Sequence, residues 1–285
     1  MRVSSSPAQS SPPVRRRGNG AVRRWLAAGA LALGWLLATP TANATPPPKH
    51  NPPKSIYLAL GDSSAFGFQL AKFLQNLPAE DPTVFNTGYV DDFAKDLRAI
   101  KPRIQTINLS CVDETTDSLL GLEPCSYHPP FPLHTEYSGS QIDAALGVLR
   151  AHRGQVSPIT INIGGADLGR GRSLEHIQAN LSRILARLRE AGPYSEIIVL
   201  GYYNPFVVTV PGSDALARDF NAHLAAAAAQ HRAEFVDPLP VFNPPVDEIA
   251  TICRLTLMCT PLQDTHASDA GYQKLADLLL AASGY

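Results

Sequence analysis

The sequence predicts an α/β fold built on a parallel sheet, and two observations predict it. Short apolar runs rich in β-branched residues alternate with longer amphipathic segments along most of the chain. The alternation starts at Ser55 and continues to Ser283 without an internal repeat. Strands that alternate with helices of this length form a parallel sheet covered by helices on both faces. We therefore expect one substantial domain of about 230 residues.

The predicted strands share a short apolar core bounded by polar residues or glycine. They cover Ser55–Leu60, Arg103–Leu109, Ser157–Gly165, Ser195–Tyr203 and Ala233–Asp237. The carboxyl ends of parallel strands meet at one edge of the sheet, where open α/β sheets bind their ligands. Residues that follow these strands are therefore the first candidates for a functional site.

The predicted helices repeat apolar residues at helical spacing. They cover Gly88–Ile100, Ser140–Gly154, Ser173–Gly192, Ser213–Arg232 and Ala267–Ser283. In Ser173–Gly192, the first residue Ser173 is the expected N-cap and the last residue Gly192 is the expected C-cap.

Two segments do not follow the alternation. Gly121–Gly139 and Val241–Asp264 are rich in proline and aromatic residues, and each contains cysteine. Long loops in a compact domain are more often functional than idle. We expect these two to form the rim of a site.

The first 44 residues have the pattern of a secretory signal peptide. A basic lead precedes the apolar run Trp25–Ala38, and Ala42-Asn43-Ala44 gives an A-x-A cleavage signal. We expect a Sec-type signal cut after Ala44, hence a secreted protein without a stable membrane span. The apolar run is shorter than the roughly 20 residues that a span needs, so an uncleaved anchor is the weaker alternative. Residues 45–54 then form a proline-rich tether before the domain at 55–285.

Charge excludes some classes of partner. The signal region carries six of the 24 Lys and Arg and none of the 25 Asp and Glu, so the mature chain has a formal net charge of 18 minus 25, or −7. No run of basic residues survives cleavage. This surface argues against nucleic acid or anionic membranes as the main partner. We expect a monomer with a small molecule or a lipid as its partner.

Four cysteines lie in the mature chain, and their order favours two local disulfides. In an exported protein an even count predicts disulfides, here Cys111–Cys125 and Cys253–Cys259. Four cysteines allow three pairings, and spacing alone leaves the choice open. The rival interpretation, a zinc site, lacks a C-x-x-C spacing.

Three residues suggest nucleophilic catalysis. Ser63 follows the first strand, while His266 precedes the last helix and Asp264 stands two residues before it. A serine and a histidine at one sheet edge suit a nucleophile and its general base, and the aspartate is close enough to orient the imidazole. Two of the three also have plainer interpretations: Ser63 as part of a helix-capping turn, and His266 as a residue that solvates a helix N-terminus.

Together, the four strand-end segments resemble the SGNH or GDSL hydrolases, more narrowly their secreted actinobacterial-type members. The matching blocks are LALGDSSAFG, NLSCVDETT, IGGADL and DTHASDAGY, supported by YYNP. The resemblance implies a flavodoxin-like three-layer α/β/α sandwich and ester hydrolysis through an acyl-serine, with no metal or organic cofactor. It implies Ser63 as nucleophile, His266 as base and Asp264 as its partner.

The chain departs from this family at two oxyanion positions. The family uses three donors, namely the serine N–H, a glycine N–H in the second block and an asparagine side chain in the third. Here the glycine position is Asp113 and the asparagine position is Ala166. Ser63 and Asp113 would supply backbone N–H donors, but the Ala166 position is degenerate. Losing one side-chain donor costs ~10²–10³ in turnover.

The aspartate raises two further difficulties. A residue with a side chain does not reach every conformation open to glycine. Its carboxylate also repels a developing oxyanion unless it points to solvent or pairs elsewhere. Asn108, Asn162 and Asn204 are candidate replacement donors for the missing asparagine.

Other polar and aromatic residues near the strand ends have structural interpretations. Asp62 and Asp167 are expected to accept hydrogen bonds from loop N–H groups. Asp269 is a competing partner for His266, although it fits the first turn of the closing helix better. Five aromatic residues are candidates for an acyl pocket or for plain core: Phe66, Phe68, Phe131, Tyr202 and Phe206.

Three hypotheses follow. The first is a secreted esterase or lipase-like serine hydrolase, with full or reduced activity. The second is an impaired pseudo-enzyme that binds an acyl or glycan ligand in the same cleft. The third is an envelope-associated scaffold, for which the sequence names no partner.

Overall fold

The structure is a computed structural model, and it describes residues 52–77, 81–129 and 131–285. The predicted signal peptide and all but the last three residues of the proline-rich tether lie outside the described residues.

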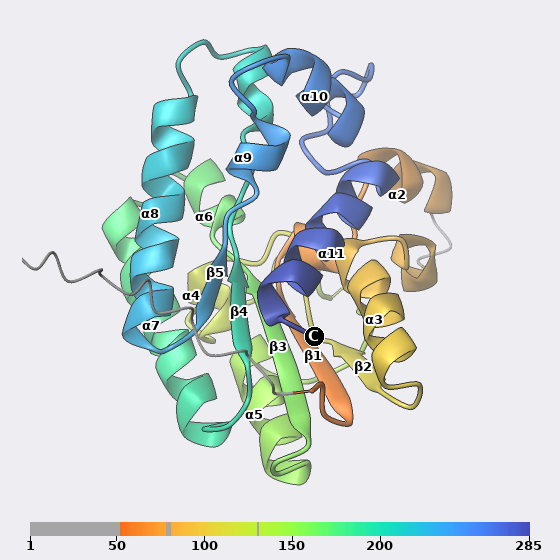
Figure 1. Ribbon diagram of the computed structural model, residues 1–285, viewed down its shortest axis with the longest axis vertical. Coiled ribbons are helices and arrows are strands. Elements are labelled where there is room, and N and C mark those ends of the chain that lie inside the picture. Colours follow the sequence, from red (N-terminus) through yellow and green to blue (C-terminus); the bar gives the residue numbers. More distant parts are fainter. Residues whose placement is uncertain (1–51, 78–80, 130) are drawn as a thin grey trace, which may run out of the picture. The chain divides into compact units, whose positions relative to one another are not determined.

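The centre of the domain is a five-stranded, all-parallel sheet (Figure 1). The strands are β1 Ile56–Gly61, β2 Gln105–Asn108, β3 Val156–Asn162, β4 Ile197–Leu200 and β5 Glu234–Val236. Their order across the sheet is β2-β1-β3-β4-β5, the doubly wound order of flavodoxin-like folds. Each strand overlaps a segment that the sequence predicts as a strand; β1 ends one residue later than its prediction and β3 begins one residue earlier, and the other three lie inside theirs. The predicted three-layer α/β/α class is confirmed.

Two helical layers cover the sheet (Figure 1). On one face lie α5 Gln141–Ala151, α7 Leu174–Ala191 and α8 Asp214–Gln230. On the other lie α3 Tyr89–Ile100 and α11 Asp269–Ser283. The predicted caps of α7 are confirmed, since Ser173 accepts the N–H of His176 and Gly192 is the C-cap.

β1 is buried on both faces, so its side chains alternate between two cores. Leu58 and Leu60 pack with residues of α5, α7 and α8, whereas Tyr57 and Ala59 pack with α3 and α11. A strand covered on both sides reads as a continuous apolar run, which explains the sequence of this segment. Truncating Leu60 to alanine is expected to cost about 2–5 kcal/mol.

Short helices, which the sequence pattern did not predict, gather mainly beyond the carboxyl edge of the sheet. They are α1 Ser63–Phe66, α2 Leu70–Asn76, η1 Pro82–Phe85, α4 Thr116–Leu119, α6 Gly165–Gly169, η2 Pro205–Val208, α9 Leu239–Phe242 and α10 Glu248–Leu255. The expectation that Val241–Asp264 is irregular was therefore wrong for the stretch of α10. Eight residues are too few for a clear helical period, and this helix is stabilised by packing Ile252 and Leu255 into the core.

Two disulfides are present, Cys111–Cys125 and Cys253–Cys259. The first ties the loop after β2 to the irregular segment that begins at Gly121, and the second ties α10 to the turn that follows it. Disulfides persist in oxidising compartments, which favours an extracytoplasmic location. Among the described residues, no helix has both the length and the apolarity of a membrane span.

Candidate active site

Ser63 lies at the carboxyl end of β1, two residues after a glycine that the geometry requires. Gly61 has a φ of +138°, and a Cβ atom there would lie 2.1 Å from the carbonyl oxygen of Asn162 on β3. A side chain is therefore excluded at this position. The sharp turn lets the strand end and α1 begin at Ser63, between β1 and β3, where the strand order reverses. Doubly wound sheets bind ligands at this point.

Asp62 has the structural role that the sequence predicts. It is the N-cap of α1 and accepts the N–H of Ser64 at 3.0 Å. Its other carboxylate oxygen accepts the hydroxyl of Tyr202. Burial raises the pKa of Asp62 to about 6, although these two hydrogen bonds oppose the shift. The carboxylate thus fixes the turn next to Ser63.

Ser63, His266 and Asp264 form one hydrogen-bonded chain. The Nε2 atom of His266 lies 2.8 Å from Ser63 Oγ, and its Nδ1 atom lies 2.6 Å from Asp264 Oδ1. Both distances are within reach of proton transfer. The contact to Asp264 fixes the tautomer with the proton on Nδ1, which leaves Nε2 free to accept the serine proton.

Asp264 is held from two directions. Its Oδ1 atom also accepts the N–H of His266, and its Oδ2 atom accepts the N–H of Leu70 at 2.7 Å. Burial opposes ionisation, but the hydrogen bonds and the neighbouring imidazole outweigh it and keep the pKa of Asp264 below its usual value. Asp269, the alternative partner, contacts Gln69 and Lys72 instead.

Asp113 has a left-handed backbone, a conformation that glycine reaches most easily. Its φ is +63°, in the left-handed region that aspartate tolerates better than most residues. Its carboxylate pairs with Arg170 at 2.6 Å and accepts the hydroxyl of Ser126. Asp113 thus holds a left-handed backbone despite its side chain, and its carboxylate is paired.

Two backbone donors face no protein acceptor. Within the described part of the chain, neither the N–H of Ser63 nor that of Asp113 takes part in a hydrogen bond. Both residues line the same cavity. Two N–H groups beside a nucleophile can hold a developing oxyanion.

The three asparagines that were candidates for the third donor are engaged elsewhere. The Nδ2 atom of Asn162 donates to the carbonyl oxygens of Leu200 and the next residue. That of Asn108 donates to the carbonyl of Ala65, and that of Asn204 donates to side chains at the start of α8. All three amides are therefore committed to other acceptors.

A cavity of about 560 Å³ opens beside Ser63 and His266. Most of its wall is apolar, formed by Val112, Ala166, Leu168, Tyr202, Phe206, Leu216, Ala217 and Phe220 among others. Ala166 therefore contributes a methyl group to the wall. The cavity has the size and lining of a small-molecule site.

The five aromatic candidates divide into two groups. Tyr202 and Phe206 line the cavity. Phe66 and Phe68 are buried in a separate cluster, against which Phe131 packs through Phe73 and Tyr127. Phe68 nevertheless touches the site, because its ring packs edge-on against the imidazole of His266 at 5.1 Å.

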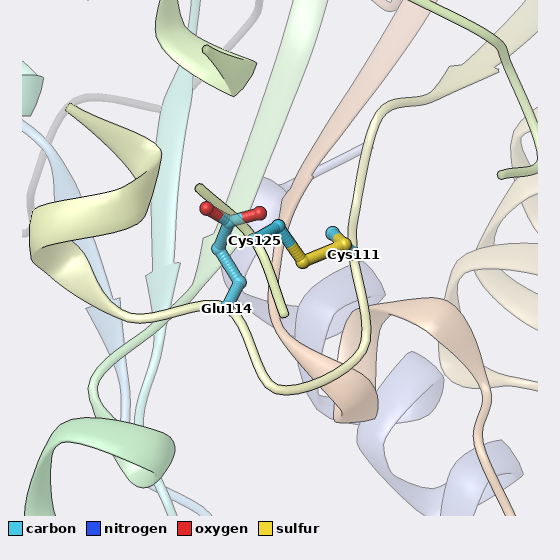
Figure 2. Close-up of side chains that lie close together, drawn as sticks. All are labelled: Cys111, Glu114 and Cys125. Atoms are coloured by element: carbon cyan, nitrogen blue, oxygen red, sulfur yellow. A yellow bond between two sulfur atoms is a disulfide. The ribbon is translucent and has the colours of Figure 1, made fainter. Parts of the chain in front are cut away.

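Within the described part of the chain, three residues with potential metal-ligand atoms lie close together. Cys111, Glu114 and Cys125 bring their side chains together beside the loop after β2 (Figure 2). The two sulfurs are bonded to each other, so the cluster offers no thiolate while the disulfide is intact. Burial raises the pKa of Glu114 to about 7 despite hydrogen bonds from Ser118 and Gln141. A protonated carboxyl is a poor metal ligand.

Sequence reasoning missed two polar residues of the site, Arg170 and Gln141. Arg170 follows the third block by two residues, and its charge was the only available signal. Gln141 is the first residue of α5 and is buried. A polar residue at a helix start normally reads as exposed, so only the structure reveals its contacts.

A doubly wound sheet with a serine, a histidine and an aspartate hydrogen-bonded in series at its carboxyl edge is the arrangement of a serine hydrolase. A model of the GDSL-like Lipase/Acylhydrolase family matches residues 59–274. The chain belongs to this family, which supports an ester-hydrolysing activity. No curated protein matches the chain significantly.

Solved structures share the fold. The extracellular lipase of Streptomyces rimosus aligns with a TM-score of 0.54 at 18% identity, over 80% of this chain and 99% of the other. An acetylxylan esterase of Geobacillus stearothermophilus aligns with a TM-score of 0.55 at 17% identity, over 82% and 95%. At these identities the likeness concerns the fold alone.

Proposed function

We propose that this protein is a secreted carboxylic ester hydrolase that works through an acyl-enzyme on Ser63. The observation that carries the proposal is the hydrogen-bonded chain from Asp264 through His266 to Ser63, which ends at an apolar cavity. The family assignment supports the same reaction class.

In the acylation step, Ser63 Oγ attacks the ester carbonyl carbon while His266 Nε2 accepts the hydroxyl proton. The C=O π bond breaks, and its electron pair moves to the carbonyl oxygen, where the N–H groups of Ser63 and Asp113 receive the charge. When the tetrahedral intermediate collapses, the bond to the alcohol oxygen breaks and His266 returns the proton to it. Asp264 stabilises the imidazolium in between.

In the deacylation step, water takes the place of the alcohol. His266 removes one proton from the water, whose oxygen forms a bond to the acyl carbon. Collapse releases the carboxylic acid, and the proton on His266 returns to Ser63 Oγ. The products are one acid and one alcohol, so atoms and protons balance.

We expect the turnover to be lower than a complete oxyanion hole would give. Ala166 supplies no side-chain donor, and the nearby asparagines are engaged elsewhere. One missing donor corresponds to ~10²–10³ in rate. The retained triad geometry argues for slow catalysis rather than for none.

The cavity favours an apolar acyl group as the substrate part nearest Ser63. Its wall offers few polar partners apart from the residues of the reaction itself. An acyl chain would bury methylene groups there at about 0.8 kcal/mol each. We therefore propose esters of short- or medium-chain acids.

The experiment compares the mature, oxidised chain with its Ser63→Ala variant on p-nitrophenyl acetate, butyrate and octanoate, and adds labelling by a fluorophosphonate probe. Serine-dependent hydrolysis and labelling support the proposal. Hydrolysis that Ser63→Ala leaves unchanged contradicts it. Ligand binding without turnover or labelling would favour the pseudo-enzyme, for which the missing donor at Ala166 is the supporting observation.

The location and organisation of the protein belong to the same proposal. We propose cleavage after Ala44, a tether to residue 54, a hydrolase-like domain over 55–285, and a monomer of the secreted actinobacterial type. The basic and apolar pattern of the first 44 residues supports the signal, and the two disulfides support an oxidising compartment. Mass spectrometry of the exported chain identifies the cleavage site.

A further inference from the structure

We propose that Arg170 is a positioning residue, which holds Asp113 so that its backbone N–H serves the oxyanion while its carboxylate is kept from it. The inference rests on the proposed function and deepens it. It explains how a hydrolase uses an aspartate at a position where the family has glycine.

The difficulty at Asp113 is both steric and electrostatic. A left-handed backbone disfavours most residues with a side chain, and its φ of +63° places Asp113 in that region. The residue also lines the cavity that contains Ser63 and His266. A free carboxylate there would repel the negative charge that forms on the substrate oxygen during the reaction.

Arg170 binds both the carboxylate and the backbone carbonyl of Asp113 from the neighbouring loop. It is the C-cap of α6, the helix that follows β3 and contains Ala166. Its Nη2 atom lies 2.6 Å from Asp113 Oδ2 and 3.1 Å from Ser126 Oγ, and also approaches the Asp113 carbonyl at 3.4 Å. Its Nη1 atom donates to Glu123 Oε1 at 3.2 Å. One planar guanidinium therefore contacts both the side chain and the backbone of Asp113.

A second contact fixes the other end of the same loop. Asp167 in α6 accepts the N–H of Thr116 at 2.8 Å and its hydroxyl at 2.6 Å. Loop residues 113–116 are thus attached to α6 at both ends, by Asp167 and by Arg170. The Asp113 N–H is consequently placed by the helix that contributes Ala166 to the cavity.

Because the Arg170–Asp113 ion pair is partly exposed, an effect of Arg170 on turnover can be distinguished from an effect on stability. The side chains of Arg170 and Asp113 are 35% and 51% exposed. Ion pairs this accessible add little to stability. Loss of Arg170 should therefore change turnover much more than the unfolding midpoint.

The test is a double-mutant cycle on Ser63-dependent hydrolysis of p-nitrophenyl butyrate. Arg170→Gln is made in the wild-type chain and in an Asp113→Gly background, where no carboxylate needs to be held. We expect about a tenfold loss of kcat with little change in KM in the wild-type chain, a fraction of the effect of losing a whole donor. In the glycine background we expect a loss of less than about twofold.

Two further variants sharpen the test. Arg170→Lys keeps the charge but loses the planar fork, so it should recover only part of kcat. Arg172→Gln is the matched control, because this arginine faces Asp117 and Glu123 and not Asp113. Its turnover should stay close to that of the unmodified chain.

The outcomes are distinct. Equal losses in both backgrounds, or no loss in the wild-type chain, would overturn the role of Arg170 while Ser63-dependent hydrolysis leaves the proposed function intact. Absence of Ser63-dependent hydrolysis from every variant, Asp113→Gly included, would overturn the proposed function and this inference with it. A loss confined to the Asp113 background, with an unchanged unfolding midpoint, supports the inference.

Discussion

The side-chain amide of Gln141 forms hydrogen bonds with both the N–H and the carbonyl of Gly61. Its Oε1 atom accepts the Gly61 N–H at 2.7 Å, and its Nε2 atom donates to the Gly61 carbonyl at 3.1 Å. Nε2 also donates to Glu114 Oε2 at 2.9 Å. Gln141 is only 1% exposed, so no water replaces these contacts. The first residue of α5 thus holds the end of β1, two residues before Ser63.

Replacing Gln141 by leucine should therefore destabilise the domain. The change leaves the buried N–H of Gly61 without its acceptor and removes one of the hydrogen bonds to Glu114, at a cost of about 2–4 kcal/mol. Urea unfolding measures the loss. Gln155→Leu is the control, because that side chain is exposed. Equal losses of stability in the two variants would contradict the role of Gln141 in holding the Gly61 backbone.

The partner of His266 can be tested with two aspartates close in sequence. Asp264→Asn removes the charge that accepts the Nδ1 proton, and the amide can impose the wrong tautomer. We expect kcat to fall by roughly 10³–10⁴. Asp269→Asn should leave kcat close to the original value, because Asp269 contacts Gln69 and Lys72. Steady-state kinetics measure kcat for both variants. A larger loss of kcat for Asp269→Asn than for Asp264→Asn would make Asp269 the partner of His266.

The fold was predictable from sequence because its signal is periodic. Apolar runs and amphipathic helices report burial directly, and a doubly covered strand such as β1 has an unmistakable pattern. The short helices at the sheet edge carry no such signal. α10 illustrates this, since its eight residues contain only two turns of a helix.

The residues of the site were predictable where the chemistry requires a particular residue type. They were not predictable where a residue's role depends on which side chains it contacts in the folded chain. Ser63, His266 and Asp264 stand in recognisable blocks, and the structure brings them within hydrogen-bond distance. The pairing of Asp113 with Arg170 depends on how two loops meet, as does the commitment of Asn162 to Leu200. Sequence spacing does not contain that information.

Introducing an amide at Ala166 should raise turnover. The methyl group lines the same cavity as Ser63 and His266, so asparagine there places a donor near the developing oxyanion. We expect kcat for p-nitrophenyl butyrate to increase at least tenfold, with ~10²–10³ as the upper limit. Ala166→Leu is the control of matched size without a donor, and it should give no increase. A rise with leucine would show that cavity shape, not hydrogen bonding, limits the rate.

The far wall of the cavity should set the acyl length. Ala217 and Phe220 line the cavity from α8. Ala217→Trp fills part of that space, so we expect kcat/KM to fall for p-nitrophenyl octanoate by about tenfold or more and to change little for the acetate, since each excluded methylene loses about 0.8 kcal/mol. Ala215→Trp places the same ring on an exposed position of the helix and should not change the ratio. An unchanged ratio in Ala217→Trp would place the acyl chain elsewhere.

Glu114 should make stability fall as pH rises. Burial raises its pKa from 4.5 to about 7, so between these values the unfolded chain has released a proton that the folded chain still holds. The free energy of unfolding therefore decreases through this window and is lowest above pH 7. Since a tenfold change in an ionisation equilibrium is worth about 1.4 kcal/mol, the ionised carboxyl costs the folded state up to roughly 3 kcal/mol at pH 8.

Glu114→Gln isolates this effect, because glutamine keeps an acceptor for Gln141 and does not ionise. Asp62 and Asp167 also have raised pKa values, but both are present in the two proteins, so the difference between variant and parent reports on Glu114. We expect the variant to gain stability over the parent progressively from pH 5 to pH 8 in urea unfolding. Glu190→Gln, at an exposed position, should show no such trend. A constant difference across this range would mean that Glu114 ionises as readily in the folded chain as in the unfolded one.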